Sequence, residues 1–539
     1  MSTAVSTLWN KLWEMHYKAK DTLLFFAKTN TSEAKNLNDS NSLNDNPHNQ
    51  KPEKMTARQK VGLILGPALF ILFYFFIEPA GMSEQAIAVL ASTLWIATWW
   101  ITEAIPIPAT SLLPIILFPL TGAIEGNITS SYADNNIFLF MGGFIIAVAM
   151  EKWNLHRRIA LNIILAVGTN TNRLILGFMV ATGFLSLWIS NSATAMMMMP
   201  IGLAVIHHVN ESINDHSQRN NFAKTLMLGI AYSASIGGLG TLIGTPPNTI
   251  FASFVKEFYG IEISFATWMA FGLPLATILL IIAWVYLVKA GFPLKLKELP
   301  GGREVIQSQK RDLGAMSFEE KLVFIVFILT AFAWISRTFI LKFIPDDTVI
   351  AIMAAVLLFL LPAKRGKSGR ILNWEDAVKI PWGILLLFGG GLAIAKGFSD
   401  SGLAKWIGEQ LTVLQGVHFM ILVTLVTALV IFLTEITSNT ATATMMYPIM
   451  ASLALSLEVH PYALLVAAGL SASCAFMLPV ATPPNAVVFG SGYITINDMV
   501  KAGFWLNILC IIAITLMIYF IMPTVWGIDL NIFPDNMRQ

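Results

Sequence analysis

The sequence predicts an all-α polytopic membrane protein with about 11 transmembrane helices and two re-entrant helical hairpins, arranged as inverted repeats. Three observations support this fold class. The chain of 539 residues is strongly apolar, one polar twelve-residue stretch occurs twice within it, and the distribution of Lys and Arg gives the two copies opposite directions through a membrane.

The composition excludes an ordinary soluble protein. Hydrophobic residues make up 55% of the chain and charged residues only 12%, which is about half of the ~25% found in soluble domains. Uncharged runs such as Val61–Ile77, Leu322–Ile335 and Leu506–Met522 approach the ~20 residues that cross a bilayer. The formal net charge of +2 indicates no nucleic-acid partner. Cys474 and Cys510 both lie in apolar segments, which favours buried thiols over a disulfide or a metal site.

The repeated stretch organises the chain. The first copy, Ser190–Ile201, reads SNSATAMMMMPI, and the second, Ser438–Ile449, reads SNTATATMMYPI. A Thr-Pro-Pro-Asn sequence follows each copy, at Thr245–Asn248 and Thr482–Asn485. The basic flanks place the first copy on a run that enters from the cytoplasm and returns, and the second on a run that enters from outside. Repeats over 136–255 and 381–495 with opposite orientation and broken helices are typical of secondary transporters.

A hairpin tip inside the membrane has a specific chemistry. The first arm ends in unpaired carbonyl groups, and the second arm begins with unpaired N–H groups. These groups must be buried in protein or face water. The carbonyl end suits a small cation, and the N–H end suits an anion. The sequence therefore predicts that each Ser-Asn tip binds a cation on one side and an oxyanion on the other.

Hydroxyl side chains precede both tips at matching positions. Ser186 and Ser190 are four residues apart, as are Thr434 and Ser438, and Thr437 lies beside the second pair. Neutral oxygen ligands fit a monovalent hard cation better than Ca²⁺ or Mg²⁺, which prefer carboxylates. The alternative is that each hydroxyl bonds to a carbonyl of its own helix.

The two Ser-Asn tips and the two Pro-Pro-Asn breaks resemble the divalent-anion:sodium symporter family, the INDY-like carriers of dicarboxylates, citrate and sulfate, over about residues 60–525. The resemblance implies a homodimeric, elevator-type symporter that imports di- or tricarboxylates with sodium. A sulfate or phosphate carrier is the alternative within this class. The family resemblance implies sodium as the coupling ion and no other cofactor. It also implies a lipid bilayer and a small anion as partners. Ser192 departs from the family pattern, since many members carry Thr there.

The resemblance also implies the site residues. The sodium ligands would be Ser186, Ser190, Asn191 and Gly244 at one site, and Thr434, Thr437, Asn439 and Ala481 at the other. The anion would contact Asn191, Ser192, Thr245, Asn439, Thr440 and Pro483.

The predicted organisation has six parts, with the N-terminus in the cytoplasm, the C-terminus outside and the spans in the plasma (inner) membrane. They are a cytoplasmic amphipathic helix and linker (1–60), scaffold helices (61–135), repeat 1 (136–290), a basic cytoplasmic loop with scaffold helices (291–380), repeat 2 (381–525) and an extracytoplasmic tail (526–539). The N-terminal helix over Ser6–Phe26 could lie on the membrane or pack against a partner.

Two further readings concern single side chains. Glu435 is an intramembrane carboxylate without a counterpart in the first repeat, where Leu187 stands. Glu435 could have a structural role as a hydrogen-bonding group or a functional role, such as proton coupling.

An intramembrane enzyme with Ser190 or Ser438 as nucleophile would need a base within hydrogen-bond reach. The eight histidines fall in predicted tails, loops or span ends, so the sequence favours a carrier over an enzyme.

Overall fold

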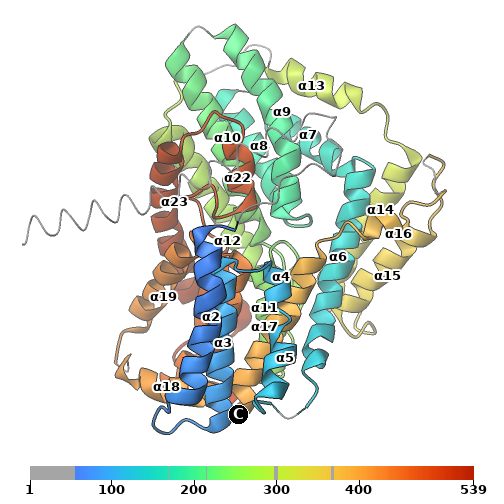
Figure 1. Ribbon diagram of the computed structural model, residues 1–539. Helices are drawn as coiled ribbons and strands as arrows, with labels where there is room; N and C mark the ends of the chain where they lie inside the picture. The colour runs from blue at the N-terminus through green and yellow to red at the C-terminus, as the bar shows by residue number, and fades with distance from the viewer. Residues whose placement is uncertain are drawn as a thin grey trace, which may run out of the picture. The chain divides into compact units, whose positions relative to one another are not determined.

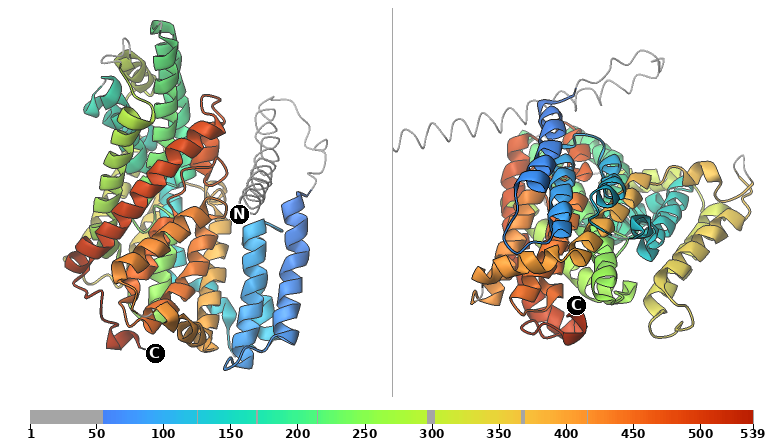
Figure 2. Two further views of the ribbon diagram at one scale, coloured as in Figure 1. Left: turned by 90° about the vertical axis from the view of Figure 1, so that its left-hand side faces the viewer. Right: turned by 60° about the horizontal axis from the view of Figure 1, so that its bottom comes forward.

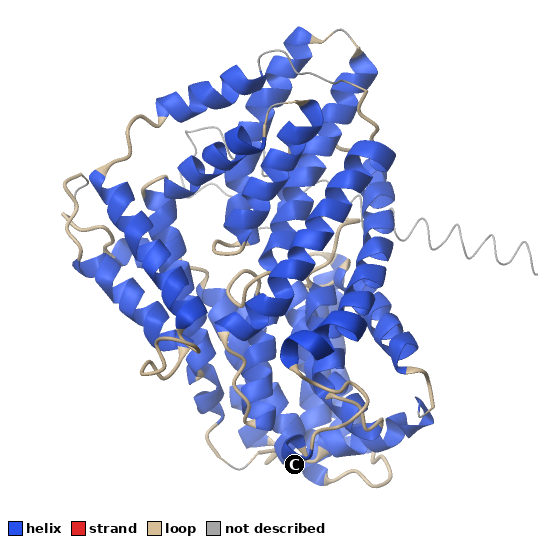
Figure 3. Cartoon of the chain, turned by 180° about the vertical axis from the view of Figure 1, so that it is seen from behind, coloured by secondary structure: helices blue, strands red, loops and turns tan. Residues whose placement is uncertain are grey.

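The computed structural model describes residues 55–538 except 125, 169, 214, 296–301, 366–368 and 415. The chain divides into two compact units, Met1–Met55 and Thr56–Gln539, and the described residues other than Met55 belong to the second. The predicted N-terminal surface helix and its linker lie outside the described residues. The described part is built from α-helices, with one isolated bridge between Pro362 and Arg370 and no strand (Figure 3). The predicted all-α class is confirmed.

The first helices form an antiparallel pair. α2 (Ala57–Phe76) and α3 (Glu84–Thr102) lie side by side (Figures 1 and 2). Thr56 begins α2 with a capping box, and Trp99 donates its indole N–H to the Gly62 carbonyl over 2.9 Å. The outer face of α2 exposes apolar side chains such as Ile64 and Phe76, as expected for contact with lipid. The pair is followed by the short helices α4 (Ile107–Thr110), α5 (Leu113–Leu120) and η1 (Ile128–Ala133).

Two series of helices then follow the same order. Each has a long helix, a short helix, a hairpin, a broken helix and a final helix that ends in a π-helical turn. The first series is α6 (Asn135–Lys152), α7 (Leu155–Val167), α8 (Thr171–Ser186), α9 (Asn191–Ser212), α10 (His216–Gly238), α11 (Pro246–Tyr259), α12 (Phe265–Tyr286) and η2 (Leu287–Gly291). The second is α17 (Trp382–Asp400), α18 (Leu403–Gln410), α19 (Phe419–Thr434), α20 (Asn439–Ser456), α21 (Pro461–Ala472), α22 (Pro483–Phe489), α23 (Ile496–Leu516) and η4 (Met517–Ile521).

The remaining helices connect the two series. The connecting helices are α13 (Gly302–Asp312), α14 (Phe318–Ser336), α15 (Asp347–Leu360) and α16 (Trp374–Ala377). Three short helices lie elsewhere: η3 (Leu411–Leu414) is inside the second series, and α24 (Met522–Trp526) and η5 (Asp535–Met537) follow it. α13 forms where the sequence predicted only a basic loop, and it packs on α7 and α9.

An ionic cluster around the buried side chains of Arg337 and Asp347 joins α14 to α15. The Arg337 guanidinium donates to Asp347 over 2.6 Å and to Glu262 over 2.7 Å. The Asp347 carboxylate also accepts the backbone N–H of Phe265 at the start of α12. The cluster therefore ties the ends of three helices together.

Seven helices of the described part are long and apolar enough to cross a membrane, and four apolar helices or helix pairs are shorter. The chain is an integral membrane protein. The predicted number of eleven spans stays a prediction. Two of the predicted spans are interrupted by the breaks between α10 and α11 and between α21 and α22, and a third is divided into α4 and α5.

The first arm of hairpin 1 packs on α10 through a glycine pair. An added Cβ at Gly237 would lie 2.5 Å from Gly183 Cα, and its other near neighbours are also backbone atoms of Gly183. Backbone atoms cannot move aside without shifting a whole helix. The absence of both side chains therefore sets how closely α8 approaches α10.

Gly237→Ala is expected to separate α8 from α10 and to destabilise the protein by about 1–3 kcal/mol, the usual cost of overpacking. Thermal unfolding of the purified protein in detergent measures the effect. Gly143→Ala is the control, because its Cβ would meet only the side chain of Ile243, at 3.4 Å. Equal melting temperatures for the two variants would contradict the close approach.

Candidate functional site

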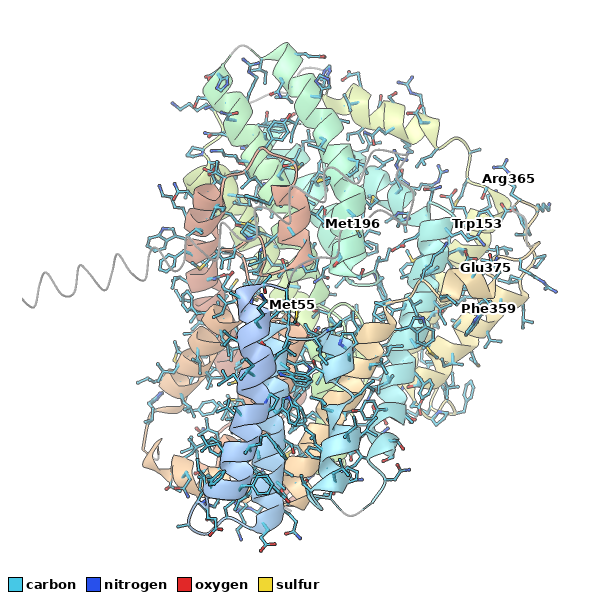
Figure 4. The ribbon with its side chains drawn as sticks, in the orientation of Figure 1. Met55, Trp153, Met196, Phe359, Arg365 and Glu375 are labelled. Atoms are coloured by element: carbon cyan, nitrogen blue, oxygen red, sulfur yellow. The ribbon has the colours of Figure 1, made fainter. Side chains whose placement is uncertain are left out.

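Both repeated stretches form helical hairpins with a tight turn at the Ser-Asn pair. α8 ends at Ser186 and α9 begins at Asn191, while α19 ends at Thr434 and α20 begins at Asn439. Ser190 caps α9 by accepting the backbone N–H of Ala193 over 3.3 Å. The first turns of α9 keep an exposed face, on which Met196 is 54% exposed (Figure 4).

At the first tip, four oxygen atoms converge. Asn191 Oδ1 lies 2.5 Å from Ser186 Oγ, 3.1 Å from the Ala234 carbonyl and 3.2 Å from the Gly244 carbonyl. Ser186 Oγ also donates to the Ala234 carbonyl over 2.6 Å. Of these four oxygens only the Ser186 hydroxyl carries a hydrogen, so in this orientation of the Asn191 amide the group lacks donors. A cation would satisfy these oxygens. A reversed Asn191 amide would instead donate to all three neighbours.

The second tip repeats this arrangement. Thr434 Oγ1 donates to Asn439 Oδ1 over 2.8 Å and to the Ala472 carbonyl over 2.8 Å. Ala472 is the last residue of α21, so its carbonyl lies at the start of the break. Each tip therefore uses a hydroxyl, an amide oxygen and a carbonyl from the broken helix.

The glycines of the first break allow this approach. A Cβ at Gly238 would lie 2.7 Å from Asn191 Oδ1 and 3.0 Å from the Gly244 carbonyl, and one at Gly244 would lie 2.5 Å from the Gly238 carbonyl. In the second break, alanines stand at the matching positions, Ala475 and Ala481. The two oxygen clusters are therefore not equivalent.

The asparagine of each Thr-Pro-Pro-Asn sequence holds its break in shape. Asn248 Nδ2 lies within 3.2 Å of the carbonyls of Gly238, Leu239 and Thr241. Asn485 Nδ2 donates to the carbonyls of Ala475 and Leu478, each over 3.1 Å. Both side chains are fully buried. They pair carbonyls that the interrupted helices leave without partners.

Three contacts join the two repeats beside the tips. The Tyr232 hydroxyl donates to the Phe476 carbonyl over 2.9 Å, and the Tyr447 hydroxyl donates to the Pro247 carbonyl over 2.7 Å. Thr245 Oγ1 lies 3.4 Å from Ser473 Oγ. α9 also packs on α22, and α20 packs on α11. Each hairpin therefore meets the half-helix of the other repeat.

The other predicted site residues are placed as follows. Ser192 is half-buried on α9, Thr440 is buried on α20, and Pro483 is exposed at the start of α22. Ala481 is buried in the second break, where its N–H donates to the Leu478 carbonyl over 3.2 Å. The Thr437 hydroxyl, in the turn between the two arms, donates to the Leu433 carbonyl near the end of α19 and lies within hydrogen-bond distance of Thr442 Oγ1. The hydroxyls of Ser190 and Thr437 are thus engaged outside the two clusters.

Sequence reasoning missed the carbonyls of Ala234 and Ala472. A signal was present, because both alanines lie in a repeated Ser-Ala-Ser sequence, Ser233–Ser235 and Ser471–Ser473, shortly before each Thr-Pro-Pro-Asn. The roles of Asn248 and Asn485 in holding the breaks were missed as well. No residue pattern predicts which carbonyl an asparagine will reach.

Comparison with known proteins decides the family. The sequence matches the family described as the sodium:sulfate symporter transmembrane region over residues 58–531. The chain belongs to this family. The predicted divalent-anion:sodium symporter family is thereby confirmed.

Relatives in this family are close in sequence. The sodium-dependent dicarboxylate transporter SdcS of Staphylococcus saprophyticus is 52% identical over 483 residues, which cover 88% of this chain and 93% of the relative. SdcS of Staphylococcus aureus (strain USA300) is 51% identical over 493 residues, covering 89% and 95%.

Solved structures share the fold alone. The Neisseria gonorrhoeae MtrF structure, described in terms of antimetabolite efflux pumps, has a TM-score of 0.51 at 11% identity and covers 86% of this chain and 95% of that one. The Alcanivorax borkumensis YdaH transporter has a TM-score of 0.53 at 12% identity, with coverage of 74% and 88%.

Gly238→Ala is expected to push the Asn191 amide out of the first oxygen cluster, because the new methyl group would overlap Oδ1. Thermal stabilisation by NaCl relative to choline chloride, measured on the purified protein, should fall. Gly202→Ala on α9 is the control, since its nearest neighbour is the flexible end of Met227 at 2.8 Å. A Gly238 variant with the sodium response of the wild type would argue against this cluster as a cation site.

Proposed function

We propose that this protein is a secondary active symporter that imports di- or tricarboxylates, such as succinate, malate, fumarate and citrate, together with sodium. The observation that carries the proposal is the doubled oxygen cluster, in which the amide oxygen of a tip asparagine meets a hydroxyl and a carbonyl of a broken helix. With the amide oxygens of Asn191 and Asn439 turned toward these groups, each cluster holds more neutral oxygens than hydrogens, which suits a monovalent cation.

The proposed sodium ligands are drawn from both elements of each repeat. They are Ser186, Asn191 and Gly244 with the Ala234 carbonyl at the first site, and Thr434, Asn439 and Ala481 with the Ala472 carbonyl at the second. The backbone oxygens of Ser190 and Thr437 are further candidates, since their hydroxyls are engaged elsewhere.

The anion would bind on the opposite side of the tip asparagines. When an amide turns its oxygen to a cation, its NH₂ group points away and can donate to a carboxylate. The N-termini of α9 and α20 add free N–H groups and a favourable dipole. Ser192, Thr245, Thr440 and the exposed Pro483 complete the proposed anion site. Anion affinity then depends on bound sodium, which is the physical basis of coupling.

The choice of substrate is supported by the relatives. SdcS proteins about 51% identical over most of the chain are named sodium-dependent dicarboxylate transporters. The family description names sulfate, so a sulfate carrier is the alternative. Tricarboxylates such as citrate belong to the same proposal.

Sodium-driven uptake in proteoliposomes tests the function. An inward sodium gradient is expected to drive accumulation of labelled succinate, while an equal choline gradient is not. Excess unlabelled fumarate should compete more strongly than sulfate or phosphate. Uptake that is equal without sodium would refute coupling, and stronger competition by sulfate would favour the alternative carrier.

Asn191→Ala and Asn439→Ala are expected to reduce uptake at least about 100-fold, because each removes a ligand shared by cation and anion; this corresponds to about 2.7 kcal/mol. Folding is checked by size-exclusion profile and melting temperature. Asn136→Ala is the control, since Asn136 lies at the start of α6, outside both tips. Wild-type transport by either tip variant would exclude that tip from the site.

The family resemblance extends the proposal to assembly and motion. A homodimer would place part of the exposed apolar surface of α14 and α15, including Leu329, Phe332 and Met353, against lipid or a second copy. An elevator motion would carry both hairpins across the membrane as one body. The proposed orientation has the N-terminus in the cytoplasm and the C-terminus outside. A transporter without enzymatic activity accounts for all the site features described.

A further inference from the structure

The buried carboxylate of Glu435 accepts four hydrogen bonds at the second tip. Glu435 follows Thr434 directly and is only 4% exposed. Its Oε1 accepts the backbone N–H groups of Phe476 over 2.8 Å and Met477 over 2.9 Å, and its Oε2 accepts that of Leu478 over 3.2 Å. Asn507 of α23 donates to Oε1 over 2.7 Å.

The backbone N–H groups of the second break are paired with a different kind of acceptor from those of the first. Three consecutive N–H groups of the second break have the carboxylate as acceptor. In the first break, the N–H groups of Leu239 and Gly240 bond to carbonyls of Ile236 and Gly237. The residue that matches Glu435 is Leu187, which offers only its backbone carbonyl, to the Thr241 hydroxyl.

Glu435 links the second oxygen cluster to the break, because it follows Thr434 of that cluster in sequence and its carboxylate bonds to residues 476–478 of the break. Thr434, the neighbour of Glu435, donates to Asn439 and to the carbonyl of Ala472, which begins the same break. The four donors to Glu435 are neutral amides. A carboxylate whose bonded partners are all neutral favours a cation nearby, and the attraction is strong where water is excluded.

We propose that Glu435 is a positioning residue for the second cation site, holding the break against the tip and supplying a fixed negative charge that the first site lacks. This inference rests on the proposed function. It assigns the two cation sites different origins of affinity. The first site forms because Gly238 and Gly244 let the backbone approach Asn191 closely. The second forms because the Glu435 carboxylate bonds to the N–H groups of the break.

Glu435→Gln tests whether the negative charge is needed. Glu435→Asp tests whether the carboxylate must reach the N–H groups of the break. The glutamine removes the charge and turns one acceptor into a donor that faces backbone N–H groups. The aspartate keeps the charge but is one methylene shorter. Glu319→Gln is the matched control, because Glu319 is also a buried carboxylate that accepts two consecutive backbone N–H groups, those of Lys364 and Arg365, over 2.8 Å each.

The full-length protein is purified, and its melting temperature is followed against NaCl at constant ionic strength with choline chloride, without dicarboxylate. Glu435→Gln is expected to raise the sodium concentration for half-maximal stabilisation about tenfold, which equals about 1.4 kcal/mol. Glu435→Asp should raise it by a smaller factor, and Glu319→Gln should leave it unchanged. At saturating sodium, the KM for succinate of Glu435→Asp should approach that of the wild type.

A purely structural role predicts another result. The melting temperature of Glu435→Gln would then fall equally at all sodium concentrations, with an unchanged sodium midpoint, and the inference would be overturned. If Glu435→Gln does not fold, an unchanged midpoint in Glu435→Asp overturns it instead. Absence of any sodium response in the wild type would refute the proposed function itself, so the two failures are distinguishable.

Discussion

The structure depends on satisfying backbone groups at helix interruptions inside an apolar protein. Two hairpin tips and two broken helices leave N–H and C=O groups without helical partners, and each would cost several kcal/mol if left unpaired in lipid. Side chains meet this need, namely Asn248 and Asn485 for carbonyls and Glu435 for N–H groups. The tip hydroxyls of Ser186 and Thr434 reach the broken helices as well. At the candidate site, this pairing is incomplete when the Asn191 amide oxygen faces the Ala234 and Gly244 carbonyls.

The two repeats use different residues to hold the broken helix next to its hairpin tip. The first break relies on glycines, so that its carbonyls can approach Asn191 at a distance that a methyl group would prevent. The second break carries alanines and is clamped by a carboxylate. An inverted repeat requires only that similar elements meet at a common centre, so the side chains of the two halves are free to diverge. A carrier with two such sites would bind its two cations with unequal affinity.

Contacts across the repeats hold this centre together. The hydroxyls of Tyr232 and Tyr447 each reach a backbone carbonyl of the opposite repeat. Both tyrosines are fully buried, so residues of the opposite repeat hold each break in addition to the asparagine of its own sequence. A substrate bound there as proposed would be held by neutral dipoles and would be released when sodium leaves. A buried arginine would retain an anion more strongly.

The sequence by itself determined the fold class, the repeated hairpins and the residue types of the tips. These features depend on local patterns, because apolar length, proline breaks and small polar residues act within one segment of chain. The short helix α13 and the division of one predicted span into α4 and α5 escaped this reasoning. Only the tertiary structure decided that Ala234 and Ala472 meet the tips, that Asn248 and Asn485 hold the breaks, and that Glu435 bonds to residues 476–478. Those partners lie about 7 to 48 residues apart along the chain, and packing of whole helices, not local preference, brings them within hydrogen-bond distance.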